Sequence, residues 1–374
     1  MKQIFLTAAC AAALGLSAIA CGSGKQSDTA DADSVATPAA GLLSSLTDVV
    51  ANGKVVFGHH DDTAYGHDWQ YEAGRSDVLE TAGRYPGLMN WDLGLIEYGD
   101  SVQLDGVPFE FIRAEVRAQD ERGGINAISW HPRNPVSGGD SWDVSAAPVA
   151  DAVTDGTAVN DTLRAWIGRA ADFVASLTDA GGRRIPVLFR PWHEHTGSWF
   201  WWGKDHCTPE QYKALWRLTR EVFDARGVDN VVWVYSPDRI AAAEEYTERY
   251  PGDEYVDILG ADAYHFGGEE GTDEFRARVR LQLDAAKALS DKNGKIIALS
   301  ETGLEGLGMD HWYTEVLLPL LGEYPVAYVC VWRNAMSTVK PGHFYAPYKG
   351  HSAEADFKAF ADNDKILMAG FVSK

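Results

Sequence analysis

The sequence predicts a single barrel of eight parallel strands that alternate with helices, the (β/α)8 or TIM barrel. From Lys54 onward, short apolar runs recur, and each is followed by a longer segment with helical character. Most of these runs are continuous in Val, Ile, Leu, Ala and aromatic residues, as expected of parallel strands that are buried on both faces. Eight strand–helix units over about 300 residues fit one barrel, which often uses this length as a single domain.

Eight segments are predicted as strands because each is a short apolar run. In chain order they are Lys54–His60, Gly87–Leu93, Ile125–His131, Arg184–Glu194, Asn230–Ser236, Val256–Tyr264, Lys295–Glu301 and Val326–Arg333. The clearest helical stretches between them are Asp161–Asp179, Thr208–Ala225, Asp273–Ser290 and His311–Leu321. Thr208-Pro209-Glu210 is typical of a helix start, with a capping hydroxyl, a proline in the first turn and an acid.

Each predicted strand is apolar at its start and polar or aromatic at its carboxyl end. The ends read HHDD, NWD, WH, WHE, YSPD, DAYH, SE and WRN. In a parallel barrel all carboxyl ends lie on one face, and catalytic groups of such barrels lie there. The sequence therefore predicts one functional rim to which every strand contributes.

Two glutamates at these strand ends carry the functional prediction. Glu194 opens a loop with the aromatic run Trp199–Trp202, and Glu301 follows the apolar run Lys295–Leu299. Hydrolysis of a glycosidic bond needs one carboxyl group that protonates the leaving oxygen and another that attacks or stabilises the anomeric carbon. Aromatic faces suit the apolar side of a sugar ring. The pattern therefore indicates a carbohydrate-cleaving enzyme.

From about Val55 to Asn334 the chain resembles glycoside hydrolase family 26, the retaining β-mannanases. The segments that carry the resemblance are FGHHDD, GGINAISWHP, RPWHEHTGSWFWWG, ADAY, LSETG and VWRNA. The resemblance implies a mannan endo-1,4-β-mannosidase that hydrolyses mannan or manno-oligosaccharides by a two-carboxylate double displacement. It places the acid after the fourth strand and the nucleophile after the seventh, and counting strands independently puts Glu194 and Glu301 at those positions.

The resemblance also implies individual roles. Glu194 is the implied general acid/base and Glu301 the implied nucleophile. His193 would hold the acid or a substrate hydroxyl, and Tyr264 would hydrogen-bond the nucleophile. The full set of implied substrate-binding residues is His131, His193, Trp199, Asp262, Tyr264, Trp332 and Arg333.

The chemistry sets requirements for this pair. Retention of configuration needs the two carboxyl groups about 5–5.5 Å apart. We expect apolar surroundings, with Trp192 and Trp199 available, to raise the pKa of Glu194 so that it donates a proton near neutral pH. Glu301 must stay ionised, and Tyr264 or Arg333 could supply the hydrogen-bond donors.

Neighbouring residues leave alternatives open. Arg190, Trp192 and Glu194 share strand parity, and we expect Arg190 to form a buried ion pair inside the barrel rather than to contact substrate. Trp91 and Trp130 fit the core and the cleft about equally well.

No metal and no cofactor are expected. The clusters His193-Glu194-His195 and His59-His60-Asp61-Asp62 crowd potential ligands, but adjacent strand residues point to opposite faces and do not converge on one ion. The HExxH spacing of zinc proteases is absent from the sequence.

Other functions remain as alternatives. The same fold could carry a β-glucanase or a β-1,3-xylanase, and a third alternative is a non-catalytic carbohydrate-binding lipoprotein. The segment Pro132–Asp143 has the Gly and Pro content of a rim loop that could narrow the glycone side of the cleft and favour release of mannobiose. An open cleft with random internal cuts is the alternative.

The amino-terminal region predicts a lipoprotein. Residues 1–20 have Lys2 and an apolar stretch typical of a secretory signal, and Cys21 is the expected lipidation site. Residues 21–40 are expected to be a flexible tether, and residues 41–374 the catalytic barrel. No acidic cluster directly follows Cys21, which favours an outer-membrane anchor facing the periplasm over one on the cell surface.

The net charge limits the classes of molecule that the protein is expected to bind, and the positions of the cysteines indicate whether they pair. The net charge of −21 argues against nucleic acid and favours a neutral polysaccharide. Apart from the lipid anchor, a sugar substrate is the only expected partner, and the protein is expected to be a monomer. Cys207 and Cys330 are expected to be free thiols, because one falls in a loop and the other in a buried strand.

Overall fold

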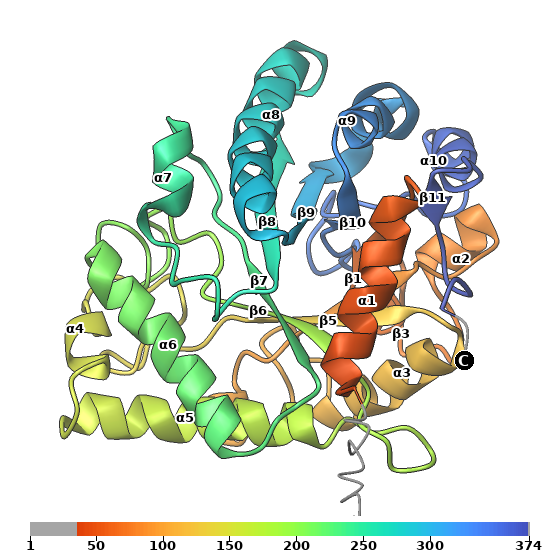
Figure 1. Cartoon of the computed structure of the whole chain (residues 1–374). Helices are drawn as coiled ribbons and strands as arrows, with labels where there is room; N and C mark the ends of the chain where they lie inside the picture. The colour runs from red at the N-terminus through yellow and green to blue at the C-terminus, as the bar shows by residue number, and fades with distance from the viewer. Residues whose placement is uncertain (1–35, 373–374) are drawn as a thin grey trace, which may run out of the picture. The chain divides into compact units, whose positions relative to one another are not determined.

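The computed structural model describes residues 36–372 and contains the predicted parallel barrel (Figure 1). Each barrel strand pairs in parallel with the next along the chain, and the last pairs with the first to close the ring. The strands are β1 (Val55–His60), β4 (Leu88–Asp92), β5 (Ile125–Trp130), β6 (Val187–Pro191), β7 (Val231–Tyr235), β8 (Ile258–His265), β9 (Ile296–Leu304) and β10 (Val326–Val331). All eight predicted strands are therefore confirmed.

Helices connect the strands and cover the barrel. They are α1 (Pro38–Ala51), α2 (Asp77–Ala82), α3 (Phe109–Glu121), α4 (Val149–Ala152), α5 (Ala158–Ala175), α6 (Pro209–Ala225), α7 (Ala243–Glu248), α8 (Gly268–Asn293), α9 (Leu318–Glu323) and α10 (Glu354–Ala361). The predicted start of α6 is confirmed, because the Thr208 side chain accepts a hydrogen bond from the Gln211 backbone N–H, and Gln211 caps Thr208 in return.

The helix predicted at His311–Leu321 differs in geometry. Residues Trp312–Leu317 form a π-helical turn, and the α-helix proper begins at Leu318. Pro319 has no backbone N–H, so the carbonyl of Glu315 has no donor four residues on, and Leu318 instead donates to the carbonyl of Tyr313.

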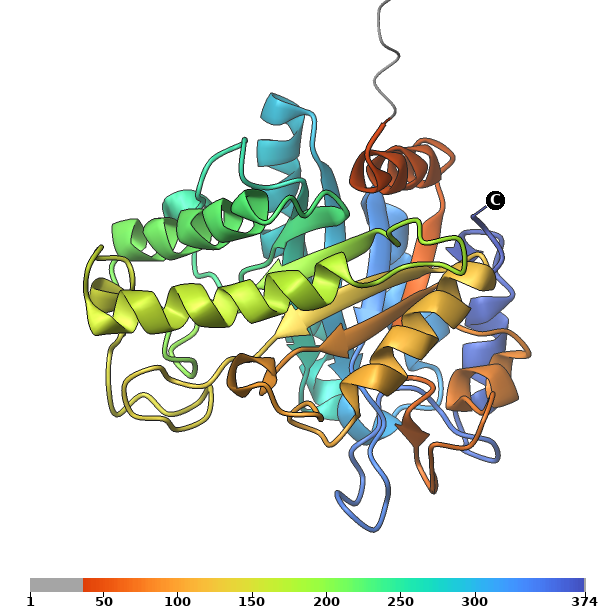
Figure 2. The same cartoon turned by 90° about the horizontal axis from the view of Figure 1, so that it is seen from below.

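Helix α1 packs against the amino-terminal end of the barrel (Figure 2). Its buried face, Leu42, Leu46 and Val49, joins the apolar side chains of the barrel interior in one cluster. This helix begins inside the segment expected to be a tether, because Pro38–Ala40 form its first turn, with Thr37 as the cap. The remaining amino-terminal predictions, including Cys21, lie outside the described residues.

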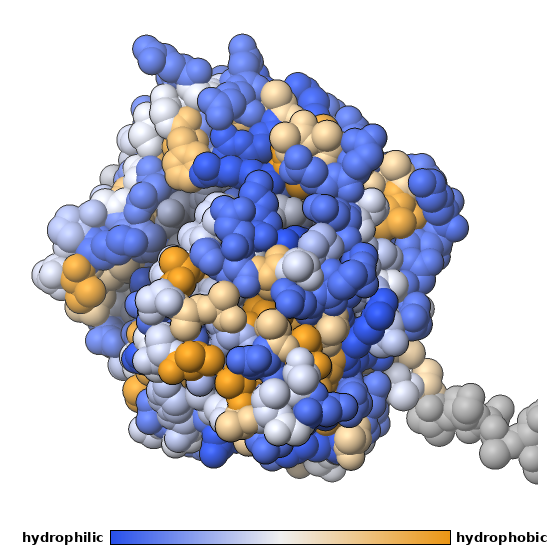
Figure 3. Space-filling model, turned by 90° about the vertical axis from the view of Figure 1, so that its left-hand side faces the viewer, coloured by the Kyte–Doolittle hydropathy of each residue, from blue (hydrophilic) through white to orange (hydrophobic). Residues whose placement is uncertain are grey.

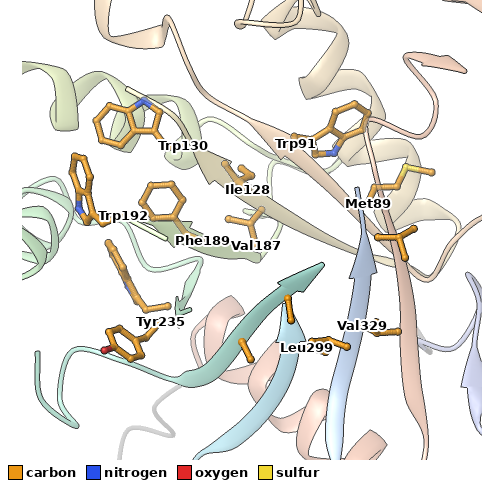
Figure 4. Packing of buried hydrophobic residues seen from close by; sticks show 14 of the residues in the cluster. Met89, Trp91, Ile128, Trp130, Val187, Phe189, Trp192, Tyr235, Leu299 and Val329 are labelled. Carbon is orange, nitrogen blue, oxygen red and sulfur yellow. The ribbon is translucent and has the colours of Figure 1, made fainter. Parts of the chain in front are cut away.

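A second core lies between the barrel and its helices. Figure 4 shows part of it, with side chains such as Trp91, Ile128, Phe189 and Tyr235 from successive strands. These side chains are fully buried or nearly so. They hold the strands, and hence the functional rim, in place.

Two short pieces complete the sheet structure. A hairpin, β2 (Tyr65–Gly66) and β3 (Trp69–Gln70), follows β1. Strand β11 (Ile366–Leu367) pairs with the start of β1, at residues Val55 and Val56, where β4 has not yet joined it. Gly87 permits this approach, because a Cβ there would lie 2.6 Å from the carbonyl oxygen of Leu367.

The exposed surface and the two cysteines of the described residues are the last features of the fold. Figure 3 shows one face that is mostly hydrophilic in its upper half and carries most of its hydrophobic residues in its lower half. Cys207 and Cys330 are buried free thiols, as predicted. Across residues 36–372, no helix combines the length and the apolarity needed to cross a membrane.

Candidate active site

Glu194 lies in a sharp turn just after β6. The strand ends at Pro191, and both Trp192 and Glu194 have left-handed backbone conformations, with φ of 52° and 54°. The Glu194 N–H still donates to the carbonyl of Ser236 at the end of β7, at 2.8 Å. The carboxyl group of Glu194 accepts a hydrogen bond from Nε1 of Trp199, at 2.7 Å. The turn thus presents Glu194 to the cleft and fixes one of its oxygens.

This turn corrects the expectation of shared strand parity. Trp192 is fully buried, and its Nε1 donates to Oγ1 of Thr219 on α6, at 2.9 Å. It packs among Trp130, Trp201 and Trp202 rather than beside the Glu194 carboxyl group. Strand parity fails here because the two positive-φ residues interrupt the extended backbone.

Burial raises the pKa of Glu194 well above its ordinary value. The negative charges of Glu301, Asp238 and Asp262 act in the same direction, whereas Arg190 opposes them. A carboxyl group in such surroundings keeps its proton at pH values where an exposed one has lost it. Glu194 is therefore placed to donate a proton.

Glu301 has the opposite surroundings. The hydroxyl of Tyr264, on β8, donates to its Oε1 at 2.6 Å. The guanidinium of Arg190, on β6, donates to its Oε2 and, through the other terminal nitrogen, to Oδ2 of Asp262 at 2.6 Å. Charge-assisted donors of this kind stabilise an ionised carboxylate. The predicted buried ion pair of Arg190 is present, and its partners include the implied nucleophile.

Asp262 and Arg333, two of the implied substrate-binding residues, are not among the side chains that line the cavity around the two glutamates. Asp262 is fully buried beneath the cleft, where it accepts hydrogen bonds from Arg190, Ser236 and Ser300 and so orients the arginine. Arg333 does not contact Glu301. Its guanidinium pairs with Asp105 at 2.8 Å and donates to the Tyr65 hydroxyl at 3.3 Å.

The two predicted histidines lie side by side in the cleft wall. His131 Nδ1 is 2.6 Å from Oδ2 of Asp92, and its Nε2 is 3.1 Å from Nε2 of His193. Burial, followed by the charge of Arg190, lowers the pKa of His193 well below its ordinary value. His193 is thus a neutral ring, bonded to His131 rather than to Glu194.

A cavity of about 310 Å³ brings the predicted residues together. It is lined by both glutamates and by His131, His193, Trp199, Tyr264 and Trp332. The sequence reasoning did not assign the remaining lining residues, which are Trp142, Phe200, Asp238, Arg239, Phe266 and Tyr345. Asp238 was visible as part of a strand-end cluster, whereas Trp142 and Tyr345 come from long loops whose path the sequence does not specify.

A smaller hollow of about 160 Å³ adjoins this cavity. The two share the side chains of His131, Trp142 and Trp332, but neither glutamate lines the smaller one. Arg333, together with Asp105 and other polar side chains, lines its far side.

The aromatic side chains of the loop after Glu194 lie partly in the core and partly in the cleft. Trp199 is partly exposed and lines the cavity, whereas Trp201 and Trp202 are fully buried. The sequence allowed Trp91 and Trp130 either a core or a cleft position. Both are fully buried and belong to the core. Within residues 36–372, no group of three or more His, Cys, Asp or Glu side chains is arranged to hold a metal ion.

Comparisons with known proteins agree on one family. The model of glycosyl hydrolase family 26 matches residues 33–304. A solved GH26 beta-mannanase from Bacteroides ovatus has a TM-score of 0.86 and 45% identity, over 90% of this chain and 97% of that one.

Two curated relatives named mannan endo-1,4-beta-mannosidase are each 33% identical. One, from Bifidobacterium adolescentis, aligns over 319 residues, which are 79% of this chain and 31% of the relative. The other, from Bacillus subtilis, aligns over 214 residues, 54% of this chain and 56% of the relative. The chain thus spans about a third and about half of the lengths of these two relatives. On the extent of the family match, the chain belongs to glycosyl hydrolase family 26.

Proposed function

We propose that the protein is a retaining β-1,4-mannanase, with Glu194 as general acid/base and Glu301 as nucleophile. The observation that carries this assignment is the asymmetry of the two carboxyl groups. Burial and neighbouring negative charges raise the pKa of Glu194, whereas Arg190 and Tyr264 donate hydrogen bonds to Glu301. Two carboxyl groups in one cleft with opposite surroundings take the opposite roles of acid and nucleophile.

The first step forms a glycosyl-enzyme ester. A carboxylate oxygen of Glu301 attacks the anomeric carbon, the glycosidic C–O bond breaks, and Glu194 gives its proton to the leaving oxygen. The ester no longer carries the negative charge of Glu301, which had helped to raise the pKa of Glu194. Glu194 therefore becomes a base, takes a proton from water, and the resulting hydroxide attacks the anomeric carbon and frees Glu301.

Mannan is proposed as the substrate because two relatives and a solved family neighbour carry mannanase names. Incubation with mannan, lichenan and β-1,3-xylan, followed by product sizing, tests this proposal. Cleavage of mannan is expected, and cleavage of lichenan or xylan alone would assign the glucanase or xylanase alternative. If none of the three is cleaved, the non-catalytic carbohydrate-binding protein is the alternative that remains. NMR of the first product formed should show the β-anomer, because double displacement retains configuration.

The smaller hollow is proposed to limit the glycone side of the cleft. The leaving group must lie toward Glu194 and Trp199, and the hollow lies beyond His131 and Trp332 without contact to either glutamate. Trp142, from the predicted rim loop, stands between the two spaces and stacks on His131. Early accumulation of mannobiose and mannotetraose from mannohexaose would support a short glycone side, whereas a spread of mannotriose and larger pieces would indicate an open cleft.

The protein is further proposed to be a lipoprotein anchored through Cys21 in the outer membrane and facing the periplasm. The described chain enters at α1, which packs at the amino-terminal end of the barrel, whereas the cleft lies at the carboxyl ends of the strands. An anchor before α1 therefore leaves the cleft free. Cys21→Ala should release the protein from the membrane fraction. Rapid loss of the wild-type protein on protease treatment of whole cells would place it on the cell surface instead.

A further inference from the structure

An exposed phenylalanine stands in the cleft at the end of β8. Phe266 directly follows β8, is 55% exposed, and lines the cavity that holds both glutamates. Because most of its ring remains in contact with solvent, this side chain adds little to the stability of the fold. Aromatic side chains that line a cavity in this way are typical of surfaces that a ligand covers.

The backbone on either side of Phe266 is tightly held. His265 is buried, accepts a hydrogen bond from Nε1 of Trp312 at 2.9 Å, and stacks on Phe275 with 4.9 Å between ring centres. On the other side, helix α8 packs closely against the turn, because a Cβ on Gly271 would overlap the carbonyl oxygen of Phe266. The fold thus fixes the position from which the Phe266 ring projects.

One guanidinium group lies near both Phe266 and the tryptophan that bonds to the acid. Cζ of Arg239 is 5.7 Å from the centre of the Phe266 ring and 5.8 Å from that of Trp199. The Arg239 side chain is 58% exposed, and its Nε lies 3.8 Å from Oδ2 of Asp238. Its N–H donors are therefore largely available to a ligand in the cavity.

These side chains lie across the barrel from the smaller hollow. Trp199, Arg239 and Phe266 follow β6, β7 and β8, whereas the residues of the hollow come from the ends of β4, β5 and β10 and the loops after them. In the closed ring of eight strands, β7 lies opposite β1, the strand between β10 and β4. Since Glu194 bonds to Trp199 and protonates the leaving oxygen, the side of β6, β7 and β8 takes the leaving part of the sugar chain.

We propose that Phe266 and Arg239 form a binding site for a sugar on the leaving side, beyond the sugar next to the cleaved bond. The identity of this sugar as mannose rests on the proposed function. The Phe266 ring covers the apolar face of the sugar, and the Arg239 guanidinium donates hydrogen bonds to its hydroxyl groups. Trp199, beside the acid, covers the sugar next to the cleaved bond.

Two substrates separate the leaving side from the rest of the cleft. Mannohexaose has sugars on both sides of the cleaved bond, whereas 4-nitrophenyl β-mannobioside has no sugar on the leaving side. Phe266→Ala should lower kcat/KM on mannohexaose by about three- to tenfold, the worth of one aromatic contact, and leave the mannobioside value within about twofold of wild type. An equal fall on both substrates, or no fall on mannohexaose, would overturn the proposal.

Conservative variants distinguish ring stacking from simple apolar contact. Phe266→Tyr keeps the aromatic face and should retain the wild-type kcat/KM on mannohexaose. Phe266→Leu is apolar but has no ring face, so it should behave like Phe266→Ala. A wild-type value in Phe266→Leu would contradict stacking on the sugar.

Tyr98→Ala is the matched control for the loss of an exposed ring. Tyr98 is 45% exposed, but it lines neither the cavity nor the smaller hollow. Both kcat/KM values should stay within about twofold of wild type. Arg239→Ala should reproduce the selective fall of Phe266→Ala. No fall on mannohexaose, or an equal fall on both substrates, would contradict the place of Arg239 in the site.

A binding measurement separates this proposal from the proposed function. Glu301→Gln removes the nucleophile, and mannohexaose is titrated into this variant and into Glu301→Gln with Phe266→Ala by isothermal titration calorimetry. The Kd should be about three- to tenfold higher in the double variant. If the wild-type protein cleaves no mannan but this Kd still rises, the proposed function fails and the leaving-side site stands. An equal Kd, or no binding to either variant, would overturn the site whatever the activity.

Discussion

Glu194 and Glu301 lie on the same rim of the barrel, but the segments that carry them are built differently. Glu301 lies within β9, which continues to Leu304, and its two oxygens are reached by Tyr264 from the adjacent strand β8 and by Arg190 from β6, three strands away. Glu194 lies beyond the end of β6 in a turn with positive φ, and its carboxyl group accepts a hydrogen bond from the neutral N–H group of Trp199. The regular strand places Glu301 among strong hydrogen-bond donors, whereas in the strained turn burial and neighbouring negative charges raise the pKa of Glu194.

The comparison teaches that protonation here depends on what a strand's neighbours provide. Glu301, inside the barrel wall, is within reach of Tyr264 on the adjacent β8 and of the charged donor Arg190 on β6. Glu194, beyond the end of its strand, meets aromatic loop residues and other acids instead. The different surroundings of the two carboxyl groups thus follow from where each strand ends.

The largest effect is expected from Glu301→Ala. Without the nucleophile no glycosyl-enzyme can form, so kcat should fall by roughly 10⁴-fold or more on polymeric and on activated aryl substrates alike. Glu254→Ala, which alters an exposed glutamate outside the cleft, should have no effect. Comparable loss in both variants, or substantial residual activity in Glu301→Ala, would show that the nucleophile lies elsewhere.

Glu194→Ala should separate the two roles. Cleavage of mannan should fall by roughly 10²- to 10⁴-fold, the usual contribution of general acid–base catalysis. Formation of the glycosyl-enzyme from an aryl mannoside with a good leaving group needs little protonation, so its pre-steady-state burst should survive. An equal loss of burst rate and of mannan cleavage would contradict the assignment of Glu194 as the acid.

The fold was predictable because strand burial and strand ends depend on local sequence. The eight apolar runs and their polar carboxyl ends specify the barrel and bring Glu194 and Glu301 to one cleft. The partners of Glu301 were harder to predict. Of the two donors that the sequence offered, Tyr264 bonds to Glu301, whereas Arg333 is bound to Asp105; Arg190, 111 residues away in the chain, supplies the other contact.

The remaining misses have local causes. Strand parity failed at Trp192 because an L-residue with φ of 52° is not foreseen from a β-rich run. Loop residues such as Trp142 and Tyr345 reach the cleft through connections without periodicity, and no sequence pattern specifies their path.

Arg190→Lys should weaken the hydrogen bonding of Glu301. A lysine keeps the positive charge but has no planar fork, so it cannot hold Glu301 and Asp262 at once. We expect kcat to fall by about ten- to a hundredfold, the worth of a hydrogen bond to a charged group. Arg184→Lys, which alters a partly exposed pair with Asp229, is the control and should leave kcat unchanged. Wild-type kcat in Arg190→Lys would mean that Tyr264 alone suffices.

Asp238→Asn should produce the smallest change, in the pH profile rather than in the maximal rate. Burial raises the pKa of Asp238 to about 6, so above that pH the group is negatively charged. Its charge helps to raise the pKa of Glu194, although less than burial and the charge of Glu301 do. Because Glu194 must be protonated to act as the acid, the alkaline limb of kcat/KM follows its pKa in the free enzyme. Removing the Asp238 charge should therefore move that limb to lower pH, while kcat at the optimum changes little. Asp161→Asn, on the exposed face of α5, should not move it. If the alkaline limb does not move in Asp238→Asn, the charge of Asp238 has no measurable effect on the pKa of Glu194. Burial and the charge of Glu301 would then be enough to keep the proton on Glu194.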